Sequence, residues 1–332
     1  MRTVGAVAVP GALRAQMMVP PVHPSIRGDR SVAEEPLPEA ELWLLLGPAV
    51  RESPVAKRLA RDFAAAFGSR FAVVSTDRVL LGVTGGKLTL HDLAGRPITP
   101  PRAAVVRLAM TPLSTDREIT LLRQLQAMGT QLINPPEAIL TCVNKFWQLQ
   151  ALAGAGLPVP DTRTYTDTRP DLAVAAGIPE PCVVKAVRGS GGHQVFLARD
   201  AAMVADVQGC LRPDVPFLFQ RYVRHSHGRD LRVIVVEGRA VAVGLRSSAN
   251  GLMQSNVSLG GTVEPCPGRF PVAEQLAVRA AEQVGLVLAG VDLLFEEDGA
   301  FTLCEVNANV RWGARVTQVT DALIAACASR LT

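Results

Sequence analysis

The strongest constraint on the fold is the stretch AGVDLLFEEDGAFTLCEVNANV at residues 289–310, where acidic and amide residues interrupt two apolar runs. The Asp298-Gly299 pair between the runs is a typical hairpin turn signal. If this pair is a two-residue turn, counting back along both strands places Asp292 directly opposite Glu305. A four-residue loop would shift the register but would keep both carboxylates on one face of the hairpin.

The pattern of this hairpin favours a metal site. Asn307 shares the face of Glu305 because side chains alternate with period two. Two facing carboxylates repel each other unless a cation lies between them. Mg²⁺ or Mn²⁺ prefers a few oxygen ligands partly shared with substrate. We therefore predict a metal site at Asp292, Glu305 and Asn307; the alternative, an exposed acidic face, fits residues 296–298 better.

A glycine-rich loop follows an apolar strand in CVVKAVRGSGGHQVFL, residues 182–197. Consecutive glycines allow backbone N–H groups to converge on an anion, and Lys185 at the end of the strand would add positive charge over phosphates. The loop lacks the G-K-[ST] of a Walker A motif, and it leads to a strand rather than to the helix of a dinucleotide fingerprint. A plain glycine hairpin turn is the alternative.

Further charged residues lie on predicted strands and at a helix start. GRDLRVIVV places Asp230 and Arg232 on one face of an apolar strand, and Arg246 ends the next strand before a polar segment at 254–256. An arginine in that position is a candidate clamp for phosphate or carboxylate, or else a solvated strand end. Lys145 begins a helix, whose N-terminus favours anions, although a surface lysine is the alternative.

The order of predicted elements divides the chain. Strands alternate with helices from about residue 41, which indicates a small α/β layer, whereas paired strands dominate residues 182–310. The divisions that we predict are a poorly ordered, proline-rich extension at 1–40, an α/β domain at 41–137, a central subdomain at 138–225 and a C-terminal subdomain at 226–332.

Composition narrows the class of protein. The 332 residues suggest two or three domains, and the net charge of +4 comes without a basic block, so we expect no nucleic-acid partner. No apolar run approaches the roughly 20 residues that span a bilayer. The six cysteines are scattered without a CxxC pair, which suits a reducing, cytoplasmic compartment. Cys182 and Cys304 lie in apolar runs and are interpreted as buried core thiols.

Several of these motifs in order resemble the ATP-grasp ligases, and within them the RimK family. The resemblance covers about residues 105–310 and is carried by INPPEAILTCVNKFWQLQALAGAGLPVPDT, VVKAVRGSGGHQVFLARD, LFQRYVRHSHGRDLRVIVVEGRAVAVGLRSSANGLMQSNVSLGG and GLVLAGVDLLFEEDGAFTLCEVNANV. The sequence of these segments is most similar to the animal branch, the N-acetylaspartylglutamate and β-citrylglutamate synthases. The glycine loop itself is more similar to the bacterial branch.

The resemblance implies an α/β chain with the α+β ATP-grasp fold, in which ATP binds between two layers. It implies phosphate contacts from Lys145, Lys185, Gly189, Ser190, Gly191 and Gly192, and an adenine hinge at Gln220, Arg221, Tyr222 and Val223. It implies further nucleotide contacts from Asp230, on the ribose side, and from Arg232. It also implies phosphoryl stabilisation by Arg246 with Asn256 beside it, and Mg²⁺ (or Mn²⁺) ligands Asp292, Glu305 and Asn307.

The family chemistry is phosphorylation of a carboxylate to an acyl phosphate, which an amine then attacks. We expect glutamate or a similar amino acid as the amine, and an acidic small molecule or a peptide C-terminus as the acceptor. Two alternatives stay open: a ligase acting on a carrier protein, and a non-catalytic nucleotide-binding scaffold. VRWGARVTQV after Asn309 departs from the family pattern and leaves acceptor choice open, with Arg311 and Trp312 near the acceptor end. Homo-oligomerisation also stays open.

Overall fold

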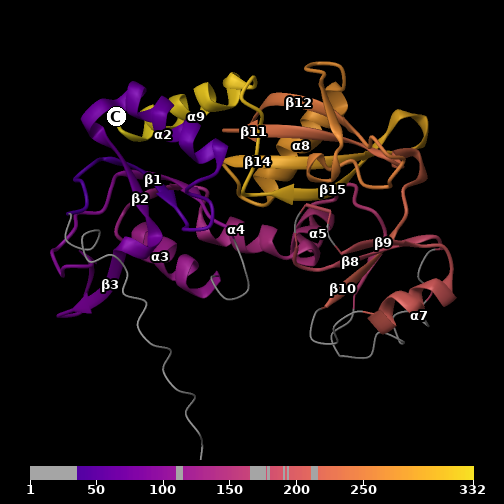
Figure 1. Ribbon diagram of the computed structural model, residues 1–332, viewed down its shortest axis with the longest axis horizontal. Helices are drawn as coiled ribbons and strands as arrows, with labels where there is room; N and C mark the ends of the chain where they lie inside the picture. Colours follow the sequence, from indigo (N-terminus) through magenta and orange to yellow (C-terminus); the bar gives the residue numbers. More distant parts are fainter. Residues whose placement is uncertain are drawn as a thin grey trace, which may run out of the picture.

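The computed structural model describes residues 36–109, 115–164, 177, 180–189, 191–192, 194–210 and 216–332 (Figure 1). The predicted extension at 1–40 therefore lies almost wholly outside the described residues. Within 36–40, Leu37 is buried and packs into the core of the N-terminal layer. No helix in the described part of the chain is long and apolar enough to cross a membrane.

The N-terminal layer is a parallel sheet with helices on both faces. Its strands run in the order β2-β1-β5-β6. Their bounds are β1 (Leu42–Leu46), β2 (Phe71–Ser75), β5 (Ala103–Arg107) and β6 (Gln131–Ile133). All residues of β1 and β5 are buried, which explains their unbroken apolar sequences, because a parallel sheet between helices exposes neither face. The alternating sequence pattern predicted this arrangement.

Local sequence signals define the helices and the hairpin of this layer. Helix α2 (Pro54–Phe67) is capped by Ser53, whose Oγ accepts the Ala56 N–H at 3.2 Å, and it ends at Gly68 with φ of 54°. The second helix, α3 (Thr115–Ala127), packs on the opposite face of the sheet. A turn at Gly85 and Gly86 joins β3 (Val79–Thr84) to β4 (Lys87–Asp92).

Two short helices connect the N-terminal layer to the rest of the molecule. They are α4 (Pro136–Val143) and α5 (Lys145–Gly154). Asn144 caps α5, because its side-chain oxygen accepts the N–H groups of Phe146 at 2.9 Å and Trp147 at 3.2 Å. The cap fixes the position of Lys145 in the first turn of the helix.

The central part is a small antiparallel sheet in the order β7-β10-β8-β9. Its strands are β7 (Thr162–Arg163), β8 (Cys182–Ala186), β9 (Val195–Ala198) and β10 (Phe217–Arg221), with α7 (Ala201–Cys210) packed against β9. Figure 1 shows α5 between this sheet and β15 of the C-terminal sheet.

The C-terminal sheet is antiparallel, in the order β13-β12-β11-β14-β15. Its strands are β11 (Arg229–Val236), β12 (Arg239–Ser247), β13 (Thr262–Pro265), β14 (Leu288–Phe295) and β15 (Phe301–Asn307). The turn between β11 and β12 has positive φ at both Glu237 and Gly238.

The two faces of this sheet differ. Helix α8 (Pro271–Gln283) covers one face and forms a core with it. On the other face, Ile234 and Val236 pack against α9 (Thr317–Arg330), α2 and the N-terminal sheet. Side chains alternate along β11, so Arg232 and Asp230, which precede Ile234 by two and four residues, lie on that same face. One face is therefore apolar at one end and charged at the other.

In the hairpin of β14 and β15, the turn differs from the predicted one, but Asp292 pairs with Glu305 as predicted. The two-residue turn is wrong: the Glu296 N–H donates to the Ala300 carbonyl at 2.9 Å, and Phe295 pairs with Phe301, their ring centroids 5.2 Å apart. Asp292 is nevertheless opposite Glu305, because the register shifts at Cys304, which pairs with no residue of β14. A longer turn and a β-bulge thus compensate each other.

Candidate active site

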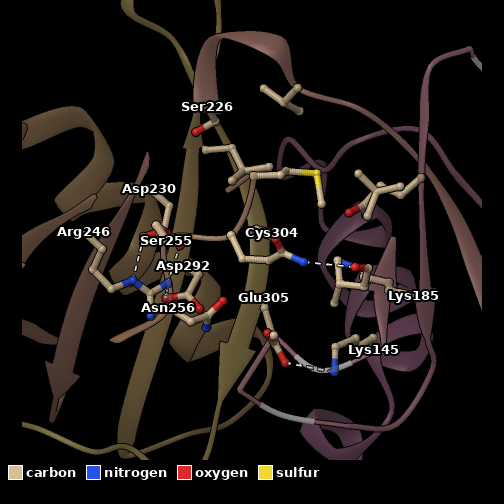
Figure 2. Close-up of a pocket in the computed structure, with 18 of the residues that line it drawn as sticks. Lys145, Lys185, Ser226, Asp230, Arg246, Ser255, Asn256, Asp292, Cys304 and Glu305 are labelled. Carbon is tan, nitrogen blue, oxygen red and sulfur yellow. Dashed lines mark hydrogen bonds and ion pairs between the residues drawn. The ribbon is translucent and has the colours of Figure 1, made fainter. Parts of the chain in front are cut away.

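A cavity between the central and C-terminal sheets collects the predicted site residues. Every one that the structure describes lines it, from elements far apart in the sequence. They are Lys145, Lys185, Gly189, Gly191, Gly192, Gln220, Arg221, Tyr222, Val223, Asp230, Arg232, Arg246, Asn256, Asp292, Glu305 and Asn307. The remaining one, Ser190, lies outside the described residues. Figure 2 shows the cavity with ten of its lining residues labelled.

Two buried lysines lie on the side of the central sheet. Lys145, held by the capped start of α5, donates from Nζ to the Gly189 carbonyl at 2.6 Å and pairs with Glu305 Oε1 at 3.3 Å. Lys185 extends from β8. Both side chains are nearly inaccessible to solvent yet line the cavity. Burying an ammonium group is costly without a partner, so this end of the cavity favours an anion.

A chain of ion pairs lies on the facing sheet. Arg246 donates from Nε to Asp230 Oδ1 at 2.6 Å, and its Nη2 is 2.9 Å from Asp292 Oδ1. Arg232 also holds Asp292, with Nη2 donating to Oδ2 at 2.7 Å. The register makes these contacts necessary, because Asp230 is the cross-strand partner of Arg246 and Arg232 that of Asp292. Figure 2 shows Arg246 between the two aspartates.

This network keeps Asp292 ionised. Burial by itself would raise the pKa of the Asp292 carboxyl, but the charges of Arg232 and Arg246 lower it below its ordinary value. The pKa of Arg246 is in turn raised, because Asp292 and Asp230 outweigh the effect of burial. The Asp292 carboxylate is therefore an anion, oriented by two guanidinium groups, on the wall of the cavity.

The bulge in β15 determines which residues reach the cavity. Leu303 and Val306 point into the core under α8, whereas Cys304 and Glu305 both line the cavity opposite Asp292. The interpretation of Cys304 as a core thiol is therefore wrong, while Cys182 is fully buried. The bulge could not be predicted from the sequence, because Cys304 fits an apolar strand equally well.

Asp292, Glu305 and Asn307, the predicted metal ligands, lie together on the wall of the cavity. Asn307 lies two residues beyond Glu305 and lines the cavity, and its buried Nδ2 has no hydrogen-bond partner within the described residues. An anionic oxygen in the cavity would supply that acceptor. In the described part of the chain no three His, Cys, Asp or Glu residues cluster as a complete metal site. Two carboxylates and an amide suit Mg²⁺ only when substrate oxygens complete the coordination, so the residues fit a metal-bound phosphate.

The predicted hinge joins β10 to the short 3-10 helix Arg224–Ser226. Gln220 donates to Thr162 Oγ1 at 2.8 Å. Arg221 pairs with Glu296 of the C-terminal sheet, with Nη2 2.5 Å from Oε1, and the Tyr222 hydroxyl is 2.5 Å from His227 Nδ1. The hinge therefore ties the two sheets together at this end of the cavity. That its backbone contacts adenine stays a prediction.

The glycine loop lies against the segment that follows β12. Ser258 donates from Oγ to the Gly191 carbonyl at 3.0 Å, and Gln254 donates to the Val195 carbonyl at 3.0 Å. A Cβ on Gly192 would lie 2.7 Å from Asn256 Oδ1, and the φ of Gly192 is +78°. Glycine is thus required at this position for two reasons, the close approach and the left-handed backbone.

Other lining residues were not predicted, including Ser226, Arg229, Met253, Ser255 and Leu294. Ser226 connects two elements, because its Oγ donates to the Arg229 carbonyl at 2.8 Å and accepts the Phe295 N–H at 2.9 Å. The predicted ribose-side role of Asp230 stays untested; here both of its carboxylate oxygens contact Arg246.

Comparisons with known proteins agree on one family. A family model described as a RimK-like ATP-grasp domain matches residues 142–325. Mouse N-acetylaspartylglutamate synthase A is 41% identical over 278 residues, covering 82% of this chain and 73% of that protein. Human β-citrylglutamate synthase B is 43% identical over 278 residues, covering 82% and 72%. The ATP-grasp ligase PsnB, solved with minimal precursor, Mg and ADP, has a TM-score of 0.64 at 20% identity, covering 87% of this chain and 98% of that one, which shows the shared fold.

Proposed function

Because the chain belongs to the RimK-like ATP-grasp family, we propose that it joins glutamate, or a similar amino acid, to a carboxylate of an acidic acceptor. The protein is an ATP-dependent ligase that forms a carbon–nitrogen bond.

One observation carries the proposal: an acidic edge and a cationic edge face each other across a single cavity. Asp292 and Glu305 lie on β14 and β15, while Lys145 and Lys185 lie across from them on α5 and β8. The Lys145–Glu305 ion pair crosses the gap at 3.3 Å. A magnesium–nucleotide complex supplies negative phosphates and a divalent cation together, and so complements both edges at once.

The nucleotide would bind with its phosphates between the lysines and the glycine loop. Lys145 and Lys185 would neutralise phosphate charge, and Gly191 and Gly192 would allow the backbone to approach closely. The hinge at 220–223 would contact the adenine, with Asp230 and Arg232 nearby. Asp292, Glu305 and Asn307 would hold Mg²⁺, or Mn²⁺, which when bound to the phosphates screens the charge that develops during phosphoryl transfer.

The proposed reaction needs little covalent participation from the protein. The acceptor carboxylate oxygen attacks the γ-phosphorus of ATP, the bond to the β–γ bridging oxygen breaks, and ADP leaves. The amine of the second substrate then attacks the acyl carbon, loses a proton, and displaces inorganic phosphate to give the amide. Arg246 would hold Asp292 in place and add positive charge near the transferred group, with Asn256 beside the glycine loop.

The relatives indicate the substrate class. The names N-acetylaspartylglutamate synthase and β-citrylglutamate synthase each describe glutamate joined to an acyl group that carries further carboxylates. We therefore infer an acidic acceptor, either a small molecule or an acidic peptide C-terminus, and glutamate as the amine.

A screen of ADP release tests the proposal. Purified protein with ATP and Mg²⁺ would receive N-acetylaspartate, citrate or a glutamate-terminated peptide, each with and without glutamate. Release should require both the acceptor and the amine. The Glu305→Ala variant should lose at least about 100-fold in turnover, since it lacks a proposed metal ligand. Glu297→Ala, in the exposed turn of the same hairpin, is the matched control and should retain full activity.

Undiminished turnover in Glu305→Ala would refute the metal assignment. The absence of ADP release with every pair of substrates would refute the proposed ligation.

A further inference from the structure

A second group of cationic side chains lies at the end of the N-terminal sheet. Arg107 is the last residue of β5 and pairs in register with Leu46, the last residue of β1. From β1 the chain proceeds first to β2 on one side and later to β5 on the other, so the topology reverses between β1 and β5. In open α/β sheets, ligands bind beyond the carboxyl ends of the strands at such a reversal.

Two arginines lie against one indole at this place, and a third arginine precedes it in the chain. The guanidinium carbon of Arg107 is 5.6 Å from the ring centroid of Trp312, and that of Arg58 is 5.8 Å from it. Arg58 also donates to the Trp312 carbonyl at 2.9 Å. Arg311, the preceding residue, is exposed. Among the residues that the structure describes, no carboxylate forms an ion pair with Arg58, Arg107 or Arg311.

Arg107 is buried and forms no ion pair with a carboxylate of the described residues. Its side chain is 4% exposed, and its Nη1 has no hydrogen-bond partner in the described part of the chain. The buried Nε1 of Trp312 lacks an acceptor there too. Burial, and then the charge of Arg311, lowers the pKa of Arg107 to about 10. A buried charge without a partner is destabilising, and two neighbouring donors without acceptors indicate that an anion is the missing component.

The same segment of chain connects this cluster to the cavity. Beyond Asn307, the side chain of Asn309 donates to the Leu108 carbonyl at 2.7 Å, directly after Arg107. The five residues from Asn307 to Arg311 are joined by four Cα–Cα steps, which span at most about 14 Å even when fully extended. The segment that leaves the cavity at Asn307 therefore leads directly to the end of β5, where Arg107 lies.

We propose that Arg107, assisted by Arg311 and the indole N–H of Trp312, binds a second carboxylate of the acceptor and selects acceptors with more than one acidic group. This inference rests on the proposed ligation. Arginine suits the task because its planar guanidinium can bind a carboxylate through two parallel hydrogen bonds. The Arg107 side chain holds the acceptor, and takes no part in the transfer of the phosphoryl group.

The proposal is tested by measuring kcat and KM for several acceptors. The main comparison is between N-acetylaspartate and N-acetylalanine, which lacks the side-chain carboxylate. Citrate and the glutamate-terminated peptide are measured as further acidic acceptors. In the Arg107→Gln variant, KM for the best diacid or triacid acceptor should rise about 10- to 100-fold, because a charge-assisted hydrogen bond is lost. KM for ATP and for glutamate should change less than about twofold. The ratio of kcat/KM for N-acetylaspartate to that for N-acetylalanine should fall by the same factor by which the acceptor KM rises. Arg107→Lys should restore part of that preference.

Arg61→Gln is the matched control, because Arg61 lies one turn beyond Arg58 on α2, is exposed and pairs with Asp62. A merely structural role of Arg107 would lower the melting temperature and leave acceptor preference unchanged. We expect the reverse, an unchanged or higher melting temperature, because the variant removes an unpaired buried charge. If Arg107→Gln does not fold, Arg311→Gln at an exposed position should lower the same preference about 3- to 10-fold.

The two proposals fail differently. A wild-type protein that ligates none of the acidic acceptors would contradict the proposed function. A wild-type protein that ligates them, together with Arg107→Gln and Arg311→Gln variants that keep its acceptor preference, would overturn only the assignment of this subsite.

Discussion

Asp292 lies directly opposite Glu305 in the C-terminal sheet. This pairing arises because Cys304, the residue before Glu305, pairs with no residue of the facing strand. The bulge lets Leu303 and Val306 fill the core on one side while Cys304 and Glu305 both line the cavity. The facing carboxylates are each balanced by cations, Asp292 by Arg232 and Arg246, and Glu305 by Lys145. Each of the two carboxylates on this wall of the cavity therefore has a cationic partner.

Replacing Asp292 by Asn should affect both properties together. The variant leaves two buried guanidinium groups without their shared anion, so the free energy of unfolding should fall by about 3 kcal/mol or more. Turnover should fall at least about 100-fold as a proposed metal ligand weakens. Urea unfolding and ADP release measure the two effects; a stable, fully active variant would contradict the assignment.

Arg246 should be more costly to remove alone than together with its partner. Arg246→Met leaves Asp230 buried and uncompensated, and we expect a loss of about 3–5 kcal/mol in the free energy of unfolding. The double variant Arg246→Met with Asp230→Leu removes both charges and should recover more than half of that loss. A double-mutant cycle by urea unfolding checks this coupling. Additive losses would show that the pair contributes no interaction energy.

The ion pairs of Asp292 should make an acid-sensitive contribution to stability. Because the folded-state pKa of Asp292 lies below its ordinary value of 3.8, its contribution is complete above about that pH and is lost as pH falls further toward the folded-state value. The difference in unfolding free energy between the wild type and Asp292→Asn should stay constant from pH 7 to about pH 5 and shrink below about pH 4. A difference that shrinks between pH 7 and pH 5 would mean that the pKa is raised.

Cys304 lines the cavity but should be a poor nucleophile. Burial raises the pKa of its thiol, and burial likewise raises the pKa of Cys142 to about 12. With iodoacetamide at pH 7.5, the exposed Cys210 should react first and Cys304 much more slowly, as mass spectrometry of individual cysteines would show. Rapid alkylation of Cys304 would indicate a reactive thiolate beside the phosphate end of the cavity.

Much of this organisation is predictable from sequence because it depends on local patterns. Parallel strands buried on both faces produced unbroken apolar runs such as LWLLL, and period-two alternation assigned Asp230 and Arg232 to one face. The charged positions that stand out in apolar strands proved to line one cavity. Family resemblance supplied their proposed roles.

Three features depend on tertiary contacts and so escaped prediction. The bulge at Cys304 accompanies a longer turn, beside which Phe295 packs against Phe301 and Phe270. Helix α9 has no strongly one-sided apolar pattern, because the N-terminal sheet and β11 both contact it. The pairing of Asp292 with Arg246 depends on three strands in register.

The central claim is that ATP phosphorylates the acceptor carboxylate, and the transfer of an oxygen atom from acceptor to phosphate tests it most directly. The wild-type protein would ligate glutamate to its best acidic acceptor, labelled with ¹⁸O in the carboxylates, and the released phosphate would be analysed by mass. Attack of the acceptor carboxylate on ATP predicts one labelled oxygen in each phosphate released from a fully labelled acceptor, with equal amounts of ADP and amide. Unlabelled phosphate accompanied by amide formation would contradict the phosphorylation of the acceptor.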